Sequence, residues 1–112
     1  MANLRRAKYG NRKVTTPDGL TFDSKREHGE WVKLEALARK GVIKDLRRQV
    51  PYELKVNGEK VTRYVADFTW YEHVAPSTWL HVVADAKGYI TPEFKLKAKL
   101  FKALHGCDIR LL

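Results

Sequence analysis

Apolar residues recur at helical spacing in the first third of the chain. After Ser24, four of them follow one another at intervals typical of one helix face: Trp31, Leu34, Leu37 and Ala38. Ser24 is a favourable N-cap, and Glu27 lies three residues later, at the spacing of a capping box. Gly41 is a favourable C-terminal residue because glycine readily adopts the left-handed conformation that ends many helices. The pattern predicts a helix between Ser24 and Gly41.

A second helix is predicted near the end of the chain. Thr91 is a suitable N-cap, and Pro92 suits the first helical position because its missing N–H is not needed there. The helix should continue to about His105 and end at Gly106.

A long β region separates the two predicted helices. Residues 42–56 form one β-like run, and we expect an interruption or bulge near Pro51, which cannot donate to a central ladder. Asn57-Gly58 is the strongest short hairpin signal. The return strand is predicted over residues 61–71, which are rich in Val, Thr and aromatic side chains.

Further strands are predicted on both sides of this hairpin. Residues 73–77 are predicted to form a loop, and residues 79–84 a nearly all-apolar strand that is central and covered on both faces. A short hairpin is predicted over residues 14–22 because Pro17-Asp18-Gly19 is a strong turn signal. Residues 108–112 could add a final short strand. The chain of 112 residues suits one α/β domain, residues 14–112.

Positive charge dominates the composition. Lys and Arg number 22 against 13 Asp and Glu, for a formal net charge of +9, which indicates a polyanionic partner such as nucleic acid. The first 13 residues form a basic arm that is either a solvated tail or a segment that lies along phosphates. Its cationic residues are Arg5, Arg6, Lys8, Arg12 and Lys13.

Several classes of site are excluded by the residue content. Cys107 is the single cysteine, so the chain can form neither an internal disulfide nor a cysteine-type zinc site by itself. Its four histidines lack metal-ligand spacing. No signal peptide is visible, and no apolar run reaches the length of a membrane span. We expect a cytoplasmic protein without membrane contact, in the host cytoplasm if a phage encodes it.

Candidate chemistry lies at the ends of two predicted strands. Asp85-Ala86-Lys87 follows the apolar strand, and alternation projects Asp85 and Lys87 from the same face. Asp67 interrupts the preceding strand, where a carboxylate is costly to bury unless it is paired or bound to metal. In suitable register, the two aspartates could share a hard cation, since neighbouring strands lie about 4.8 Å apart.

The short acid-x-Lys pattern proves little by itself, because it occurs four times. The other three copies begin at Asp23, Glu53 and Glu93. Only the copy at Asp85 follows a buried-type strand and has an isolated strand aspartate upstream. The structural alternative is an ion pair between Asp85 and Lys87, with Asp67 capping a turn.

The chain resembles the PD-(D/E)xK nuclease superfamily and, within it, small phage and prophage proteins of the DUF1064 family. The similar stretches are residues 8–11, 22–27, 64–68, 85–89 and 95–101. The resemblance implies a single restriction-endonuclease-like domain: a central mixed β-sheet flanked by two helices, in the order αβββαβ, after the N-terminal hairpin. One departure is Ala66, which stands where the motif has proline.

The resemblance also implies a catalytic centre. Asp67 matches the first acid of the motif, and Asp85 and Lys87 match its second half. Glu27 is the best match to a metal-binding glutamate of the first helix, although a capping-box bond to Ser24 explains it too. Three further positions join the candidate site: the backbone carbonyl of Ala86 as a ligand, Gln49 as a neighbour or an ordinary strand residue, and Glu30 as the alternative acid.

The expected reaction is Mg²⁺-dependent hydrolysis of phosphodiester bonds in DNA, with Mn²⁺ able to substitute, since hard cations choose carboxylate oxygens. Branched or junction intermediates of phage replication and recombination are the expected substrates, cut by a homodimer. DNA would contact the N-terminal arm and a basic track formed by Arg47, Arg48, Arg63, Lys95, Lys99 and Lys102. The last three equally fit a solvated helix face. The rival functions are a catalytically silent nucleic-acid-binding module on the same fold and an RNA-associated basic protein.

Overall fold

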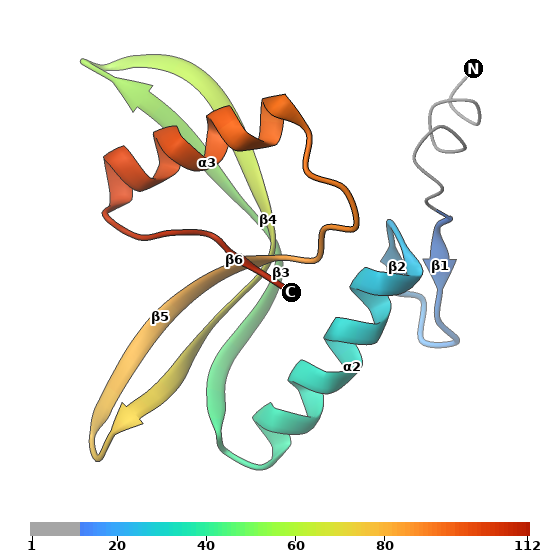
Figure 1. Ribbon diagram of the computed structural model, residues 1–112. Helices are drawn as coiled ribbons and strands as arrows, with labels where there is room; N and C mark the ends of the chain where they lie inside the picture. The colour runs from blue at the N-terminus through green and yellow to red at the C-terminus, as the bar shows by residue number, and fades with distance from the viewer. Residues whose placement is uncertain (1–11) are drawn as a thin grey trace.

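Two helices and six strands make up the computed structural model, which describes residues 12–112 (Figure 1). Most of the predicted basic arm, with Arg5, Arg6 and Lys8, lies outside the described residues. In chain order the elements are β1 (Val14–Thr15), β2 (Thr21–Phe22), α2 (Lys25–Arg39), β3 (Ile43–Val56), β4 (Glu59–Ala75), β5 (Thr78–Asp85), α3 (Pro92–His105) and β6 (Arg110–Leu111). None of the helices within residues 12–112 is long and apolar enough to cross a membrane.

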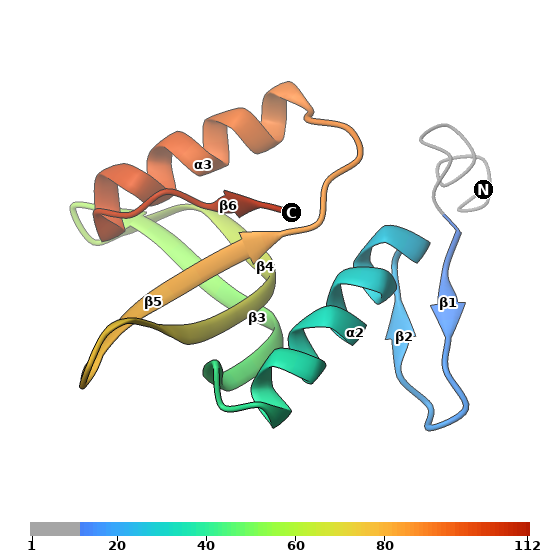
Figure 2. The same ribbon diagram turned by 60° about the horizontal axis from the view of Figure 1, so that its bottom comes forward.

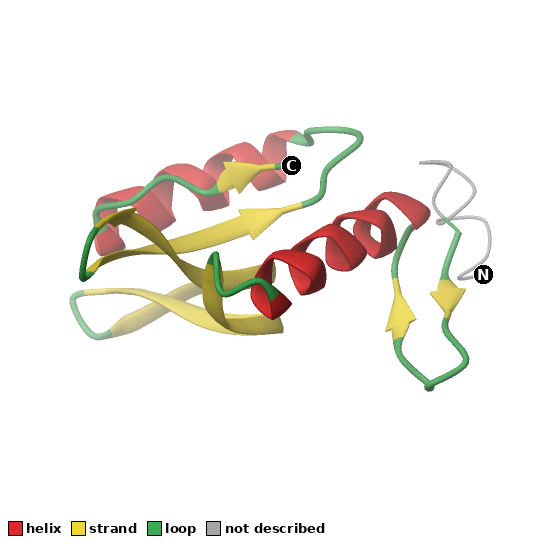
Figure 3. Cartoon of the chain, turned by 90° about the horizontal axis from the view of Figure 1, so that it is seen from below, coloured by secondary structure: helices red, strands yellow, loops and turns green. Residues whose placement is uncertain are grey.

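Strands β3 to β6 form one mixed sheet in the order β3-β4-β5-β6. Strand β4 runs antiparallel to both β3 and β5, and β6 pairs with β5 in parallel. Strands β1 and β2 form a separate hairpin, which projects beyond the start of α2 (Figure 3). The α/β class, the mixed central sheet, the two helices and the N-terminal hairpin predicted from the sequence are confirmed.

Local signals place the ends of α2 where the sequence predicted them. The Ser24 hydroxyl accepts a hydrogen bond from the Glu27 amide at 3.1 Å. At the other end Gly41 has φ +77°, and the amide of Val42 reaches back to the carbonyl of Leu37 at 3.1 Å. These bonds satisfy polar groups that a helix end leaves without intrahelical partners.

Helix α3 follows the same logic. The Thr91 hydroxyl accepts from the amide of Phe94 at 3.0 Å, and Pro92 occupies the first turn. Gly106 ends the helix with φ +74°.

The strands depart from the prediction in two respects. Strand β4 continues through Ala75, so the predicted loop over residues 73–77 is wrong and shrinks to a tight turn at Pro76 and Ser77. Pro51 lies in register opposite Val65, and the register shifts fall elsewhere in β3. Proline is accommodated here because β3 is an edge strand. The bulge expected near Pro51 is therefore not at that residue: the pairing shifts register between Lys44 and Arg47 and between Leu54 and Lys55.

Each helix covers its own apolar cluster on the twisted sheet (Figures 1 and 2). Phe68 belongs to the cluster beneath α2, whereas Ala66 belongs to the cluster beneath α3. On β5, Val82 belongs to the cluster beneath α2 and Val83 to the cluster beneath α3, so this part of the strand is covered on both faces. Leu80, nearer the start of β5, is 46% exposed. Asp67 therefore lies where the two clusters meet.

The α2 cluster predicts a large stability loss on truncation of Phe68. This side chain is fully buried and stacks on Trp31 with ring centroids 6.0 Å apart. We expect Phe68→Ala to lower the free energy of unfolding by about 3–5 kcal/mol in urea denaturation. Leu96→Ala is the control, because Leu96 is 70% exposed and should change stability by less than about 0.5 kcal/mol. Equal losses in the two variants would contradict this packing.

Candidate active site

The carboxylates of Asp67 and Asp85 each accept a hydrogen bond from the backbone of the opposite strand at the end of the β4–β5 pair. The amide of Asp67 donates to Asp85 Oδ1 at 3.0 Å, and the amide of Ala86 donates to Asp67 Oδ2 at 3.0 Å. The regular pairing of these strands begins one residue farther in, at Phe68 opposite Ala84. The two carboxylates thus take over the role of ladder bonds where the strands separate.

Asp85 is fully buried and faces the core beneath α3. The Tyr64 hydroxyl donates a hydrogen bond to its Oδ2 atom, and Tyr64 itself packs in the α3 cluster. Both oxygens of Asp85 therefore have protein donors. The prediction that Asp67 and Asp85 come together is supported by the geometry, with Asp85 behind Asp67 rather than beside it on an open surface.

Glu27 is 2% exposed and completes an acidic cluster. Its Oε1 accepts from the amide of Asp23 at 3.0 Å, so the reciprocal capping bond goes to Asp23 rather than to Ser24. Gln49 joins Glu27 to Asp67: its Nε2 lies 2.9 Å from Glu27 Oε2 and 3.5 Å from Asp67 Oδ1. The sequence placed both Glu27 and Gln49 near the site, and the structure brings them together with Asp67.

Arg48 lies inside the molecule beside this cluster. Its guanidinium stacks 4.0 Å from the ring centre of Phe22, donates to the carbonyl of Thr21 at 2.8 Å and lies 3.8 Å from Glu27 Oε2. Its side chain is only 16% exposed. Arg48 therefore ties β3 to the N-terminal hairpin and offsets the charge of Glu27, a position that does not suit the predicted contact with DNA.

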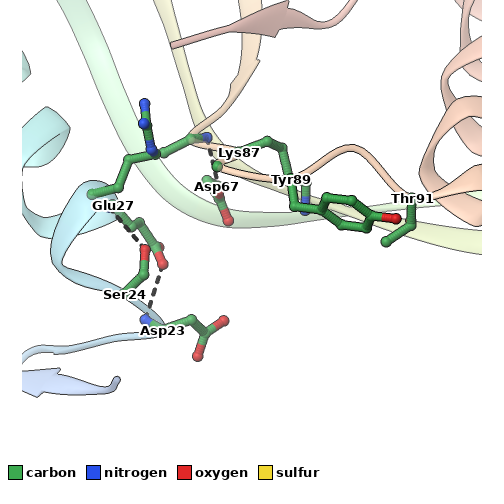
Figure 4. Close-up of a pocket in the computed structure, with 10 residues that line it drawn as sticks. Asp23, Ser24, Glu27, Asp67, Lys87, Tyr89 and Thr91 are labelled. Atoms are coloured by element: carbon green, nitrogen blue, oxygen red, sulfur yellow. Dashed lines mark hydrogen bonds between the residues drawn. The ribbon is translucent and has the colours of Figure 1, made fainter. Parts of the chain in front are cut away.

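A cavity of about 360 Å³ opens in front of Asp67 and Glu27 (Figure 4). One wall comes from the start of α2, and the other from the loop that joins β5 to α3. The lining residues are Asp23, Ser24, Arg26, Glu27, Asp67, Ala86, Lys87, Gly88, Tyr89 and Thr91. The cavity is therefore built from segments that carry the site residues predicted from the sequence, whereas the buried Asp85 does not line it.

Lys87 lines the cavity, but its ammonium group lies 5.0 Å from the centre of the Phe94 ring. Among the described residues no ion pair includes Lys87, so the alternative of an Asp85–Lys87 salt bridge is wrong for this structure. Lys87 and Arg26 are thus the two cationic side chains of the cavity wall.

Burial raises the pKa of two carboxyl groups of the site. Burial, followed by the charges of Asp85 and Glu27, raises the pKa of Asp67 to about 8. Burial also raises the pKa of Glu27, against the lowering effects of the Asp23 amide and Arg48. The pKa of Tyr64 lies well above its usual range because the hydroxyl is buried next to Asp85. A positive charge placed at this cluster would relieve the repulsion.

The donor set of the cavity suits a hard cation in its chemistry. Asp67, Glu27 and the backbone of Ala86 offer oxygen ligands, which Mg²⁺ prefers. As arranged, however, no group of three or more His, Cys, Asp or Glu residues in the described part of the chain is set to hold a metal. The residues fit a cation through Asp67 and Glu27 at the cavity wall. The oxygens of Asp85, which the sequence predicts to share the cation, already accept hydrogen bonds, as those of Asp67 and Glu27 also do.

The remaining predicted residues are scattered over the surface. Glu30 pairs with Lys33 at 3.3 Å and lies in a different cavity, so it does not join the site. Arg47 is exposed and pairs with Asp45. On α3, Lys102 pairs with Asp108 at 3.3 Å. Four further predicted cations are also exposed: Arg12, Lys13, Lys95 and Lys99.

Sequence reasoning missed several residues of the site. Tyr64 was not singled out, although it lies three positions before Asp67 in a stretch that resembles the family. Arg26, Tyr89 and Thr91 also line the cavity. The sequence could have indicated them only through their position close to the predicted site residues. The bond between Tyr64 and Asp85 depends on how the twisted strands meet, which no local pattern reveals.

A family model described as "Protein of unknown function (DUF1064)" matches residues 6–111. The match covers both helices, every strand and all the residues that line the cavity. Neither a curated protein nor a solved structure gives a significant match to the chain.

The raised pKa of Asp67 predicts a pH-dependent loss of stability in metal-free protein. From about pH 4, where an unfolded aspartate ionises, to about pH 8, the folded state holds a proton that the unfolded chain has released. Stability contributed by this group therefore falls as the pH rises through that window. In urea titrations with EDTA, the wild-type protein should lose stability relative to Asp67→Asn between pH 5 and pH 8.

The matched control is Asp108→Asn, since the Asp108 side chain is 77% exposed. Its pH profile should follow that of the wild-type protein. Parallel profiles for the wild-type protein and Asp67→Asn would show that Asp67 ionises normally in the folded state.

Proposed function

Because the chain belongs to the DUF1064 family, whose description names no activity, we propose a function from the site itself: a metal-dependent endonuclease that hydrolyses phosphodiester bonds in DNA. The observation that carries the proposal is the convergence of three acidic side chains from three separate elements. Glu27 comes from α2, Asp67 from β4 and Asp85 from β5, and all three are wholly or largely buried. Such a cluster is unfavourable unless it performs a task that needs negative charge.

The same residues occur in the order typical of PD-(D/E)xK nucleases, and we assign the chain to that superfamily as part of the proposal. Asp67 and Glu27 would hold Mg²⁺ from the cavity wall, with the Ala86 carbonyl and Asp85 as further oxygen donors. A carboxylate oxygen has a second lone pair, so the bonds to Asp85 leave it able to ligate. A bound cation supplies a water of lowered pKa and stabilises charge on the phosphate oxygens.

The chain's own cations complete the proposed chemistry. Lys87 would orient the attacking water and offset the negative charge that develops on the phosphate. Arg26 lines the same cavity and would hold a phosphate oxygen. Gln49 is a positioning residue, because it fixes Glu27 and Asp67 relative to each other. The net charge of +9 supports a polyanionic substrate.

We further propose that the substrate is branched or junction DNA of phage replication and recombination, and that a homodimer makes the paired cuts. The support is the small size of the chain, which offers little DNA-contacting surface, and the symmetry of most oligomers.

A second candidate is a nucleic-acid-binding module without catalytic activity. Two observations favour it: the Lys87 ammonium lies over Phe94, and Glu27 is already offset by Arg48 and Gln49. This module would bind DNA through its basic surface and would not need Lys87.

The nuclease proposal predicts metal-dependent cleavage that fails in two variants. Purified protein is incubated with linear, single-stranded, flap and four-way junction DNA in Mg²⁺, Mn²⁺ or EDTA. EDTA should abolish cleavage, and Asp67→Asn and Lys87→Ala should each lower the rate about 100-fold or more. DNA binding by Lys87→Ala should persist, because the loss concerns the chemical step.

The chain provides its own matched control. Glu53 and Lys55 belong to another acid-x-Lys triplet and form an exposed ion pair at 3.5 Å. The double variant Glu53→Ala/Lys55→Ala should cleave at the wild-type rate. Cleavage that survives Lys87→Ala and Asp67→Asn would reject this site, and metal-independent binding without any cleavage would favour the silent module.

Metal binding is predicted to stabilise the fold through Asp67. At a free Mg²⁺ concentration about five times the dissociation constant, the wild-type protein should gain about 1 kcal/mol in urea denaturation. The gain should grow from pH 6 to pH 8, since the ligand must be deprotonated. Asp67→Asn should gain much less, and an equal gain in both proteins would place the cation elsewhere.

A further inference from the structure

A second cavity of about 410 Å³ lies between β4 and the first turns of α3. Its lining residues are Arg63, Tyr64, Val65, Lys87, Thr91, Glu93, Phe94 and Lys97. Three of these are cations and one is an acid, so this cavity is basic where the cavity in front of Asp67 is acidic. We call it the β4–α3 groove.

The groove and the acidic cavity are adjacent. Lys87 and Thr91 line both, and the loop that carries them runs from the end of β5 to the start of α3. In Figure 4 Lys87, Tyr89 and Thr91 follow this loop away from Asp67. A chain of phosphates could therefore pass from one cavity into the other along Lys87.

We propose that the DNA strand to be cut passes from the acidic cavity into the β4–α3 groove, where Arg63 and Lys97 bind phosphate groups next to the scissile one. This inference rests on the proposed nuclease function and names the form of its substrate. A space of about 410 Å³ is the size of a small-ligand site and is large enough for a sugar–phosphate segment of one strand. In this proposal the strand is unpaired on that side of the cut, as it is in a flap.

The lysine stripe predicted from the sequence is a poorer track for this strand. Lys95, Lys99 and Lys102 are exposed and line neither of the two cavities. Lys97, between them in sequence, is the α3 lysine at the groove, with a side chain only 26% exposed. A partly desolvated cation interacts more strongly with a phosphate than a fully solvated one does.

Glu93 should affect strand binding in the opposite direction from the cations of the groove. Its carboxylate lies 3.2 Å from the Lys97 ammonium, one helical turn away, and lines the same groove. A bound phosphate competes with Glu93 for Lys97 and is repelled by Glu93. Neutralising this acid should therefore strengthen strand binding, which loss of a merely structural ion pair would not do.

The test measures binding without cleavage. In an Asp67→Asn background without metal, the affinity for a fluorescein-labelled single strand is determined by anisotropy over a range of salt concentrations. Arg63→Ala and Lys97→Ala should each weaken binding about three- to tenfold and lower the salt slope by about one. Glu93→Gln should strengthen binding, and Lys99→Ala on the outer face should have the smallest effect. Thermal melting verifies that each variant is folded.

Two outcomes separate this inference from the proposed function. If Arg63→Ala and Lys97→Ala affect binding no more than Lys99→Ala while the wild-type protein cleaves DNA, the groove assignment is wrong and the nuclease stands. If no condition yields cleavage but the groove variants shift affinity in opposite directions as stated, the groove is retained as a strand-binding site. Equal affinity of the wild-type protein for a flap strand and a blunt duplex would overturn the single-strand assignment.

Discussion

The site depends on two hydrogen bonds between β4 and the end of β5: the Asp67 amide donates to Asp85, and the Ala86 amide donates to Asp67. Two carboxylates that lie close together in a largely buried position repel each other and lose hydration. The backbone amides of Asp67 and Ala86 and the hydroxyl of Tyr64 compensate for part of that cost. Because the same bonds replace the β4–β5 ladder, the strands separate at a defined residue, and the loop to α3 begins there.

The rest of the cluster balances charge at this point. Glu27 would add a third negative group, and the structure offsets it with Arg48, Gln49 and the amide of Asp23. Arg48 is in turn held between Phe22 and the carbonyl of Thr21, so the N-terminal hairpin helps to stabilise the acidic site. The raised pKa of Asp67 shows that the compensation is incomplete. Sites that retain such a cost are where function is expected to reside.

The sequence predicts the parts of this molecule that depend on local rules. Helix ends at Ser24 and Gly106 follow from capping, and the Asn57-Gly58 turn follows from backbone freedom at positive φ. The meeting of Glu27, Gln49 and Asp67 was anticipated from a resemblance rather than from periodicity. The bond from Tyr64 to Asp85 and the inward turn of Arg48 were not, because they depend on the twist and register of long strands and on packing between distant segments.

The charge distribution explains how one small surface could serve both binding and chemistry. The chain is strongly basic overall, yet the cavity in front of Asp67 is acidic and would repel a phosphate. A phosphate strand can approach such a cavity only if cations beside it outweigh that repulsion. Lys87 stands at the boundary between the acidic cavity and the basic groove. In the proposed function, cations in the groove would draw the strand toward the carboxylates, and a metal ion would be needed only where the strand would otherwise meet negative charge.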